Sequence, residues 1–165
     1  MSHHILQGRI ATPLGPLTAA RSAAGLSGLW FDGQKHHPGV LDVPEDDGHD
    51  AVLAATAAAL TAYFGGKPFT LPPLDPAGTP FQRAVWRALL EIPPGRPDTY
   101  GALAARLGRA SAARAARAVG AAVARNPISV LVPCHRVVGA DGSLTGYAGG
   151  LQRKQALLAL EQLRA

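Results

Sequence analysis

The sequence predicts a mixed α/β (α+β) fold in two parts. The first part is a small N-terminal antiparallel three-stranded sheet with a helix. The second is a C-terminal helical domain with a winged-helix-like helix-turn-helix. Three observations predict this: short apolar segments between turn residues open the chain, Ala-rich and amphipathic segments follow from residue 50, and a Pro- and Gly-rich stretch at 67–78 separates the first of these helical segments from the rest. We therefore expect a supporting domain over residues 1–75 and a second domain over 79–165.

The three strands are predicted from apolar segments bounded by turn signals. Ile5 to Ile10 and Leu17 to Arg21 flank the segment TPLG at 12–15, which has Pro at the second turn position and Gly at the fourth. Leu26 to Phe31 follows after an Ala-Gly pair. The next residues, up to Asp50, are rich in Gly, Pro, His and Asp, which predicts a loop.

Two helices are predicted from their capping residues. Asp50 is a suitable N-cap for an Ala-rich helix to Phe64, and Gly65-Gly66 ends it. Thr79, Pro80 and Gln82 form the pattern of a capping box with Pro in the first turn. Apolar residues then recur at helical spacing, at Phe81, Ala84, Val85, Ala88, Leu89 and Ile92.

A helix-turn-helix is predicted in the middle of the C-terminal part. One helix runs from Thr99 to Leu107 before Gly108, and a second runs from Ser111 to Arg125 before Asn-Pro. An apolar, β-branched run at 128–132 predicts a strand or an extended segment. A closing helix is expected from Leu151 to Arg164.

Charge is distributed unevenly along the chain. Residues 1–80 carry four basic and seven acidic groups, a net charge of −3, whereas residues 81–165 carry 12 basic and 4 acidic groups, a net charge of +8. The second helix of the helix-turn-helix has an apolar face and an opposite face formed by Arg114, Arg117, Ala121 and Arg125. An arginine stripe favours nucleic-acid binding. The alternatives are a solvated amphipathic face and a general bias toward Ala, Arg, Gly and Pro.

Several classes of protein are excluded or disfavoured. The single cysteine, Cys134, excludes an intramolecular disulfide framework and a zinc site built on several cysteines. No apolar run reaches the roughly 18 residues of a membrane span. The N-terminus lacks a signal-peptide pattern, so we expect a cytoplasmic protein. The adjacent His36 and His37 fit solvated loop residues better than metal ligands.

Cys134 is a candidate nucleophile, although a lone cysteine is most often a small buried hydrophobe. Pro precedes it, and His135 follows it as a base that can generate the reactive thiolate. In an extended segment, neighbouring side chains point apart, so a bridging water would connect the two. Glu161, on the closing helix, could orient His135.

The C-terminal half resembles the O6-alkylguanine-DNA alkyltransferases, also called methylated-DNA–protein-cysteine methyltransferases. The segment VPCHRV at 132–137 is similar to their active-site signature. The other matching segments are FQRAVW, IPPG, TYG, ARAVG, NP and GYAGGLQRK. The N-terminal half is similar more loosely, through TPLGPL and GLWFDGQ.

The resemblance implies roles for the residues around the acceptor. Cys134 matches the cysteine that takes the alkyl group from guanine. His135 matches the base that acts through a water, and Glu161 matches the carboxylate that holds this histidine. Asn126 matches the asparagine that fixes the turn beside the active site.

It also implies residues that hold the damaged base. Tyr100 matches the tyrosine that hydrogen-bonds the flipped base, and Arg117 matches the residue that fills the gap left by the extruded nucleotide. Tyr147 matches the aromatic wall of the alkyl pocket, which continues through Ala148 and Gly149. Ala148 stands where many relatives have serine, so one hydrogen bond to the base is in doubt.

Together these observations predict direct repair of alkylated guanine in double-stranded DNA by a monomer. The target nucleotide must be flipped out of the helix. The product is a thioether, and no second cysteine is present to exchange with it, so we expect a single-use reaction with no cofactor and no metal. The alternatives are a non-catalytic lesion-binding protein, whose relatives carry tryptophan at the acceptor position, a helix-turn-helix regulator, and a thiol hydrolase.

Overall fold

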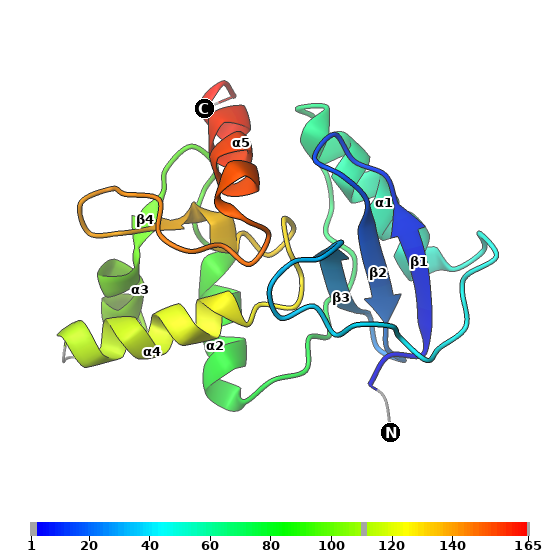
Figure 1. The fold of residues 1–165 in the computed structure, drawn as a ribbon, viewed down its shortest axis with the longest axis horizontal. Coiled ribbons are helices and arrows are strands. Elements are labelled where there is room, and N and C mark those ends of the chain that lie inside the picture. The colour runs from blue at the N-terminus through cyan, green and yellow to red at the C-terminus, as the bar shows by residue number, and fades with distance from the viewer. Residues whose placement is uncertain (1–2, 110–111, 165) are drawn as a thin grey trace. The chain divides into compact units, whose positions relative to one another are not determined.

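The computed structural model describes residues 3–109 and 112–164, and the chain divides into two compact units (Figure 1). The first unit comprises the chain up to Ala77 together with Pro127–Leu131. The second comprises Gly78–Asn126 and the chain from Val132 onward. Both α-helices and β-strands are present, as the sequence predicts.

The first unit contains the predicted three-stranded antiparallel sheet. Its strands are β1 (Leu6–Ile10), β2 (Leu17–Arg21) and β3 (Leu26–Phe31), paired in the order β1-β2-β3. In the turn between β1 and β2, the Thr12 hydroxyl donates to the Gly15 carbonyl at 2.6 Å. Gly15 has a φ of 110°, a conformation that a side chain would disfavour. Local turn chemistry therefore sets the register of this hairpin.

Helix α1 (Ala51–Phe64) packs on this sheet and completes its core. Asp50 caps the helix as predicted, because its carboxylate accepts a hydrogen bond from the Leu53 amide at 2.9 Å. The same carboxylate forms an ion pair with Arg21 of β2 at 2.8 Å. One side chain thus both starts the helix and joins it to the sheet.

The apolar run at 128–132 is not the predicted strand. Leu29 of β3 donates its amide to the Pro127 carbonyl and accepts from the Ser129 amide, at 2.8 and 2.9 Å. The chain then turns at Val130, whose φ is 69°. This conformation is rare for a β-branched residue. Because the chain turns here, the pairing with β3 ends after one bridge. Pro127–Leu131 consequently belongs to the first unit although it follows α4 in sequence.

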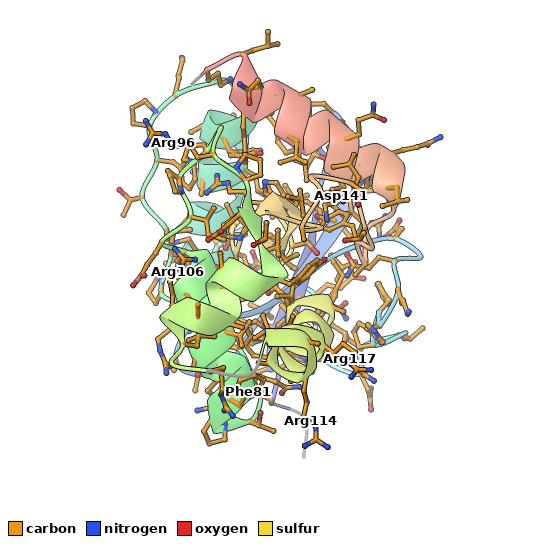
Figure 2. All side chains as sticks on the ribbon, turned by 90° about the vertical axis from the view of Figure 1, so that its left-hand side faces the viewer. Phe81, Arg96, Arg106, Arg114, Arg117 and Asp141 are labelled. Atoms are coloured by element: carbon orange, nitrogen blue, oxygen red, sulfur yellow. The ribbon has the colours of Figure 1, made fainter. Side chains whose placement is uncertain are left out.

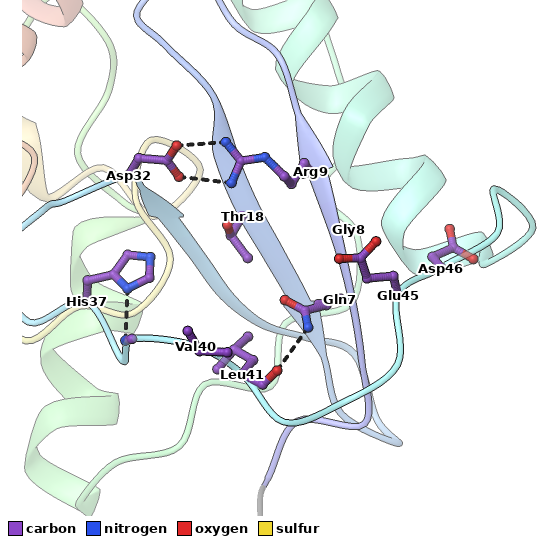
Figure 3. Close-up of a pocket in the computed structure, with 11 residues that line it drawn as sticks. Gln7, Gly8, Arg9, Thr18, Asp32, His37, Val40, Leu41, Glu45 and Asp46 are labelled. Carbon is purple, nitrogen blue, oxygen red and sulfur yellow. Dashed lines mark hydrogen bonds and ion pairs between the residues drawn. The ribbon is translucent and has the colours of Figure 1, made fainter.

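A cavity of about 520 Å³ also lies in the first unit, between the sheet and the loop after β3 (Figure 3). Arg9 and Asp32 form an ion pair on one side of it, at 2.7 Å. Gln7 donates to the Leu41 carbonyl at 3.1 Å and helps to hold the loop. None of the predicted site residues lines this cavity.

The second unit begins with α2 (Pro80–Leu89), whose predicted capping box is present. The Thr79 hydroxyl accepts from the Gln82 amide at 3.1 Å, and the Gln82 side chain accepts from the Thr79 amide at 3.0 Å. Val85 and Leu89 of the predicted apolar stripe are buried. Trp86 lies outside that stripe but is also buried, and its indole N–H donates to the Ala122 carbonyl at 2.9 Å. This bond ties α2 to the next helix pair.

The predicted helix-turn-helix corresponds to α3 (Tyr100–Arg106) and α4 (Ala112–Ala124), which pack against each other. Thr99 caps α3 by accepting from the Ala102 amide at 3.1 Å. Val119 and Val123 are buried on the predicted apolar face of α4. Ser111, the predicted start of the second helix, lies outside the described residues.

The remaining elements of the second unit carry most of the candidate site. They are β4 (Asp98–Thr99), the 3₁₀ turn η1 (Cys134–Arg136), β5 (Val137–Val138) and α5 (Leu151–Gln162). The short parallel pair of β4 and β5 has no counterpart in the sequence prediction. In the described part of the chain, no helix combines the length and apolar character needed to cross a membrane.

Candidate active site

Cys134 begins η1, a single 3₁₀ turn, rather than lying in an extended segment. The Cys134 amide donates to the Val132 carbonyl at 2.8 Å, so the chain is already turning before the cysteine. The cysteine is 6% exposed and follows buried apolar residues. The alternation of side chains expected for an extended segment therefore does not apply here.

His135 forms a fully buried hydrogen bond with Glu161 of α5. Its Nε2 lies 2.7 Å from Oε1 of Glu161, and neither side chain is more than 3% exposed. An ionised carboxylate can only accept, so we assign the hydrogen of the neutral imidazole to Nε2. Nδ1 is then left as an acceptor, and it has no hydrogen-bond partner among the described residues. This buried lone pair is suited to receive a proton.

The electrostatics of the pair favour a neutral imidazole beside a charged carboxylate. Burial lowers the pKa of His135 below its ordinary 6.5, and it outweighs the opposing effect of Glu161. Burial alone would raise the pKa of Glu161. Hydrogen bonds from His135 and Arg136 outweigh that effect and lower the pKa of Glu161 to about 2. At neutral pH His135 is therefore a base rather than an acid.

The thiol of Cys134 is protonated in the resting protein. Burial raises the pKa of Cys134, while a hydrogen bond with Asn126 and the charge of Lys154 act in the opposite direction. The Asn126 side-chain amide also donates to the Val132 carbonyl at 2.9 Å. Asn126 is buried and bridges the turn that leads into the cysteine.

Lys154 of α5 is a residue of this site that sequence reasoning did not identify. It is fully buried, and its ammonium donates to the carbonyls of Val137, Thr145 and Gly146 at 2.6, 2.7 and 3.2 Å. Burial lowers the pKa of Lys154 to about 8, opposed by the nearby Cys134. The lysine thus holds the loop before α5 and supplies positive charge near the thiol.

A sequence signal for Lys154 does exist. Lys154, Leu157 and Glu161 are spaced by three and four residues, so they share one face of α5, and all three are buried. Two charged residues on the buried face of a helix indicate a buried polar network. Of these two charged residues, only Glu161 is predicted as a site residue from the sequence.

The residues expected to hold the base lie in the loop before α5 or contact it. The Tyr100 hydroxyl, at the start of α3, donates to the Thr145 carbonyl at 3.5 Å, the same carbonyl that accepts from Lys154. The Tyr147 ring packs edge-on against the His135 ring, with centroids 6.4 Å apart. Ala148 is half-buried and Gly149 is buried directly after it.

The predicted arginine stripe forms an exposed face on α4. Arg114 and Arg117 extend outward from α4, away from α3 (Figure 2). Ala121 and Arg125 are exposed at the following helical spacings, and Arg125 lies just past the end of α4. The small side chain of Ala121 leaves the middle of this face open to close approach.

No group of three or more His, Cys, Asp or Glu side chains suited to a metal ion occurs within residues 3–109 and 112–164. The buried cluster itself offers a thiol, an imidazole, a carboxylate and the two nearby cations Arg136 and Lys154.

Two family models match the chain and together cover almost all of it. The 6-O-methylguanine DNA methyltransferase ribonuclease-like domain matches residues 5–76, and the DNA binding domain of the same name matches residues 80–163. The chain is 46% identical over 158 residues to a methylated-DNA–protein-cysteine methyltransferase of Mycobacterium tuberculosis, covering 94% of this chain and 92% of that protein. It is 45% identical over 163 residues to the Salmonella typhimurium protein of the same name, covering 93% and 94%.

The fold is also similar to that of a solved relative. The crystal structure of Mycobacterium tuberculosis OGT in complex with DNA matches with a TM-score of 0.85 and 42% identity, covering 98% of this chain and 95% of that chain. Sequence and fold therefore agree over both halves. The chain belongs to the 6-O-methylguanine DNA methyltransferase family.

Proposed function

We propose that this protein repairs DNA by moving the alkyl group of O6-alkylguanine to Cys134, in a reaction that each molecule performs once. The observation that carries this proposal is the buried cluster in which Cys134 adjoins His135, whose Nε2 is held by Glu161 while Nδ1 is left as an acceptor. The relatives named as methylated-DNA–protein-cysteine methyltransferases support the same reaction.

The transfer step is a displacement at carbon. The proton of the Cys134 thiol passes to Nδ1 of His135 through a bridging water, and the sulfur attacks the alkyl carbon. The bond between that carbon and O6 breaks, and its electron pair stays on the guanine. Tyr100 donates a proton to the leaving guanine and regains one from the His135 imidazolium. In total, one proton moves from sulfur to guanine and one alkyl group moves from guanine to sulfur.

The resting site favours selectivity over general reactivity. Burial holds Cys134 as a thiol, while Asn126 and Lys154 favour the thiolate once a proton acceptor is available. A buried thiol meets only those alkyl groups that are delivered into the pocket beside Tyr147, Ala148 and Gly149. The thioether product is stable in water, so no turnover follows.

Recognition of DNA is assigned to the exposed face of α4. Arg114, Arg117 and Arg125 supply positive charge for phosphates, and Ala121 allows the helix to approach a groove closely. Arg117 fills the space that the flipped nucleotide leaves in the base stack. A relative from Mycobacterium tuberculosis has been solved in complex with DNA, which supports this assignment.

The two parts of the chain are assigned different roles. We assign DNA binding and alkyl acceptance to residues 79–165 and a supporting role to residues 1–75. The protein is expected to act as a monomer on double-stranded DNA, without a cofactor, and in the cytoplasm. Each of these assignments rests on the sequence pattern and on the family.

Intact-mass measurement tests the proposed function directly. The protein is incubated with a duplex oligonucleotide containing O6-methylguanine, with the Cys134→Ser variant as the control. We expect the wild-type mass to rise by one methylene group and the variant mass to stay unchanged. Binding without a mass change would indicate a lesion-binding protein, and continued product release without a mass change would indicate a hydrolase.

A further inference from the structure

Glu161 is shared by two neighbouring side chains of η1. Glu161 accepts hydrogen bonds from Arg136 as well as from His135. Nε of Arg136 lies 3.0 Å from Oε2 of Glu161, and Nη2 of Arg136 lies 2.9 Å from Oε1. The Glu161 side chain is 3% exposed and the Arg136 side chain 12% exposed. The transfer mechanism above makes no use of Arg136, yet this guanidinium contacts both oxygens of the carboxylate that orients the base.

Arg136 is fixed in this position from its other side. Its Nη1 donates to the Ile92 carbonyl, just past the end of α2, at 2.6 Å. The guanidinium therefore spans from α2 to α5 and cannot leave the carboxylate without breaking bonds at both ends. A guanidinium stays charged at every pH at which proteins are folded. Glu161 thus has a permanent counter-charge that does not depend on the protonation of His135.

This counter-charge matters because a buried carboxylate otherwise recruits a proton to its neighbour. Glu161 favours the imidazolium form of His135, whose Nδ1 carries a hydrogen and can accept nothing, whereas burial and the charge of Arg136 both oppose that form. The other groups facing His135 are the Lys154 ammonium, which also disfavours the imidazolium, and the Tyr147 ring edge and Cys134 thiol, which are uncharged in the resting state.

We propose that Arg136 is a positioning residue that neutralises Glu161, so that His135 remains an uncharged base whose Nδ1 can take the proton of Cys134. The inference rests on the proposed function for its biological meaning, but the protonation of His135 can be measured independently of it. Glu161 then orients the imidazole through a hydrogen bond, while the charge of Arg136 opposes the electrostatic effect of Glu161 on the ring.

The test is an NMR titration of the His135 ring nitrogens, in parallel with the pH dependence of methyl transfer. Wild type, Arg136→Gln and Arg136→Lys are compared. Glutamine can still donate to Glu161 but carries no charge, whereas lysine keeps the charge. We expect neutral His135 with hydrogen on Nε2 in the wild type at pH 7. We expect the midpoint of His135 to rise by about 1 to 3 pH units in Arg136→Gln and much less in Arg136→Lys.

The acid limb of the methyl-transfer rate should shift with the imidazole midpoint. In the double variant Arg136→Gln/Glu161→Gln the upward shift should disappear, because the carboxylate that drives it is gone. A purely structural role would lower the stability or the rate of Arg136→Gln without moving either midpoint, and that result overturns the proposal.

The wild-type titration can also overturn the proposal by itself, whether or not the variants fold. An imidazolium at His135 in the wild type at pH 7 contradicts the proposal. Absence of methyl transfer by the wild type would instead contradict the proposed function, while the imidazole titration would still report on Arg136. The two failures are therefore distinguishable.

Discussion

Burial and charge act against each other at Cys134. Removal of the thiol from water raises its pKa, whereas Asn126 and the Lys154 charge lower it. The outcome is a protonated thiol with a base close by, which suits a protein that must spend its only cysteine on the correct substrate. The reactivity of this residue is therefore a property of its neighbours, and substitutions of the neighbours should alter it in predictable directions.

Lys154→Met should make Cys134 less acidic. The variant removes a positive charge near the thiol and three hydrogen bonds to the loop before α5. We expect iodoacetamide to alkylate Cys134 more slowly at pH 7, where Lys154 is charged in the wild type, by about tenfold for a change of one pKa unit, as followed by intact mass. Lys67→Met, at an exposed lysine of the first unit, is the matched control and should leave the rate unchanged. An equal or faster rate in Lys154→Met would contradict the electrostatic role.

Glu161 should make the folded protein sensitive to acid. Its pKa is about 2 in the folded protein, below the ordinary value of 4.5, so the folded state holds its proton less tightly than the unfolded chain. The stability it contributes is complete above about pH 4.5 and is lost as the pH falls toward 2. We expect Glu161→Gln to be less stable than wild type at pH 5 and to lose less stability on acidification. Urea unfolding at several pH values measures the stability of both proteins and its change with pH. A stability difference between the two proteins that stays constant with pH would refute this expectation.

At the scale of elements, local signals predict the caps and the strands well. Asp50, Thr79 and Thr99 each cap a helix through a bond to a residue three positions later, so the information lies within one turn of chain. The hairpin of β1 and β2 is specified by its four-residue turn. These elements needed no knowledge of distant residues.

The elements that sequence analysis missed depend on distant contacts. The run at 128–132 has strand composition, but its carbonyl and amide groups pair with Leu29 only once before Val130 turns the chain. The turn at Cys134 is held by Asn126 from the preceding segment. Lys154 is buried because three carbonyls from other segments accept its hydrogens. Local propensity carries no information about such partners.

The candidate site, like the fold, could be predicted only in part from the sequence. Cys134, His135 and Glu161 were predicted from the signature segment and from the resemblance, and the structure brings them together. Their protonation states could not be predicted from the sequence, because these depend on burial and on Arg136 and Lys154. The chemistry of a site can thus be identified from its residue types, whereas its tuning requires the surroundings.

Helix α4 should act on DNA and not on the transfer chemistry. We expect Arg117→Ala to slow repair of O6-methylguanine in duplex DNA by about tenfold or more, because the flipped state loses the side chain that fills the stack. Reaction with free O6-benzylguanine should change little. Arg87→Ala, at an exposed arginine of α2, serves as the matched control. Equal losses on both substrates would refute the role of Arg117 in base extrusion.

At the scale of the whole molecule, charge is segregated along the chain. The net charge is −3 over residues 1–80 and +8 over residues 81–165, and the second range contains both the α4 face and Cys134. Long-range attraction to DNA is therefore expected to come from the C-terminal part. The acidic residues of the loop after β3 should contribute little to it.

Salt dependence of DNA binding tests this segregation. Affinity for undamaged duplex DNA should fall as salt rises from about 50 to about 200 mM, because arginine–phosphate contacts release counterions. Arg114→Gln should reduce the slope of log affinity against log salt by about 1. Asp42→Asn, a change of charge in the first unit that is equal in size and opposite in sign, should leave that slope unchanged. The same slope in all three proteins would show that binding does not use the α4 face.

The central claim is that each chain accepts one alkyl group, on its only cysteine. The most direct test is a time course with a large excess of duplex DNA carrying labelled O6-methylguanine, in which methyl groups on protein and lesions remaining are both counted. The account predicts a plateau at one lesion repaired and one methyl group bound per chain, with none in Cys134→Ser. Continued repair beyond one lesion per chain, or repair by Cys134→Ser, would contradict it.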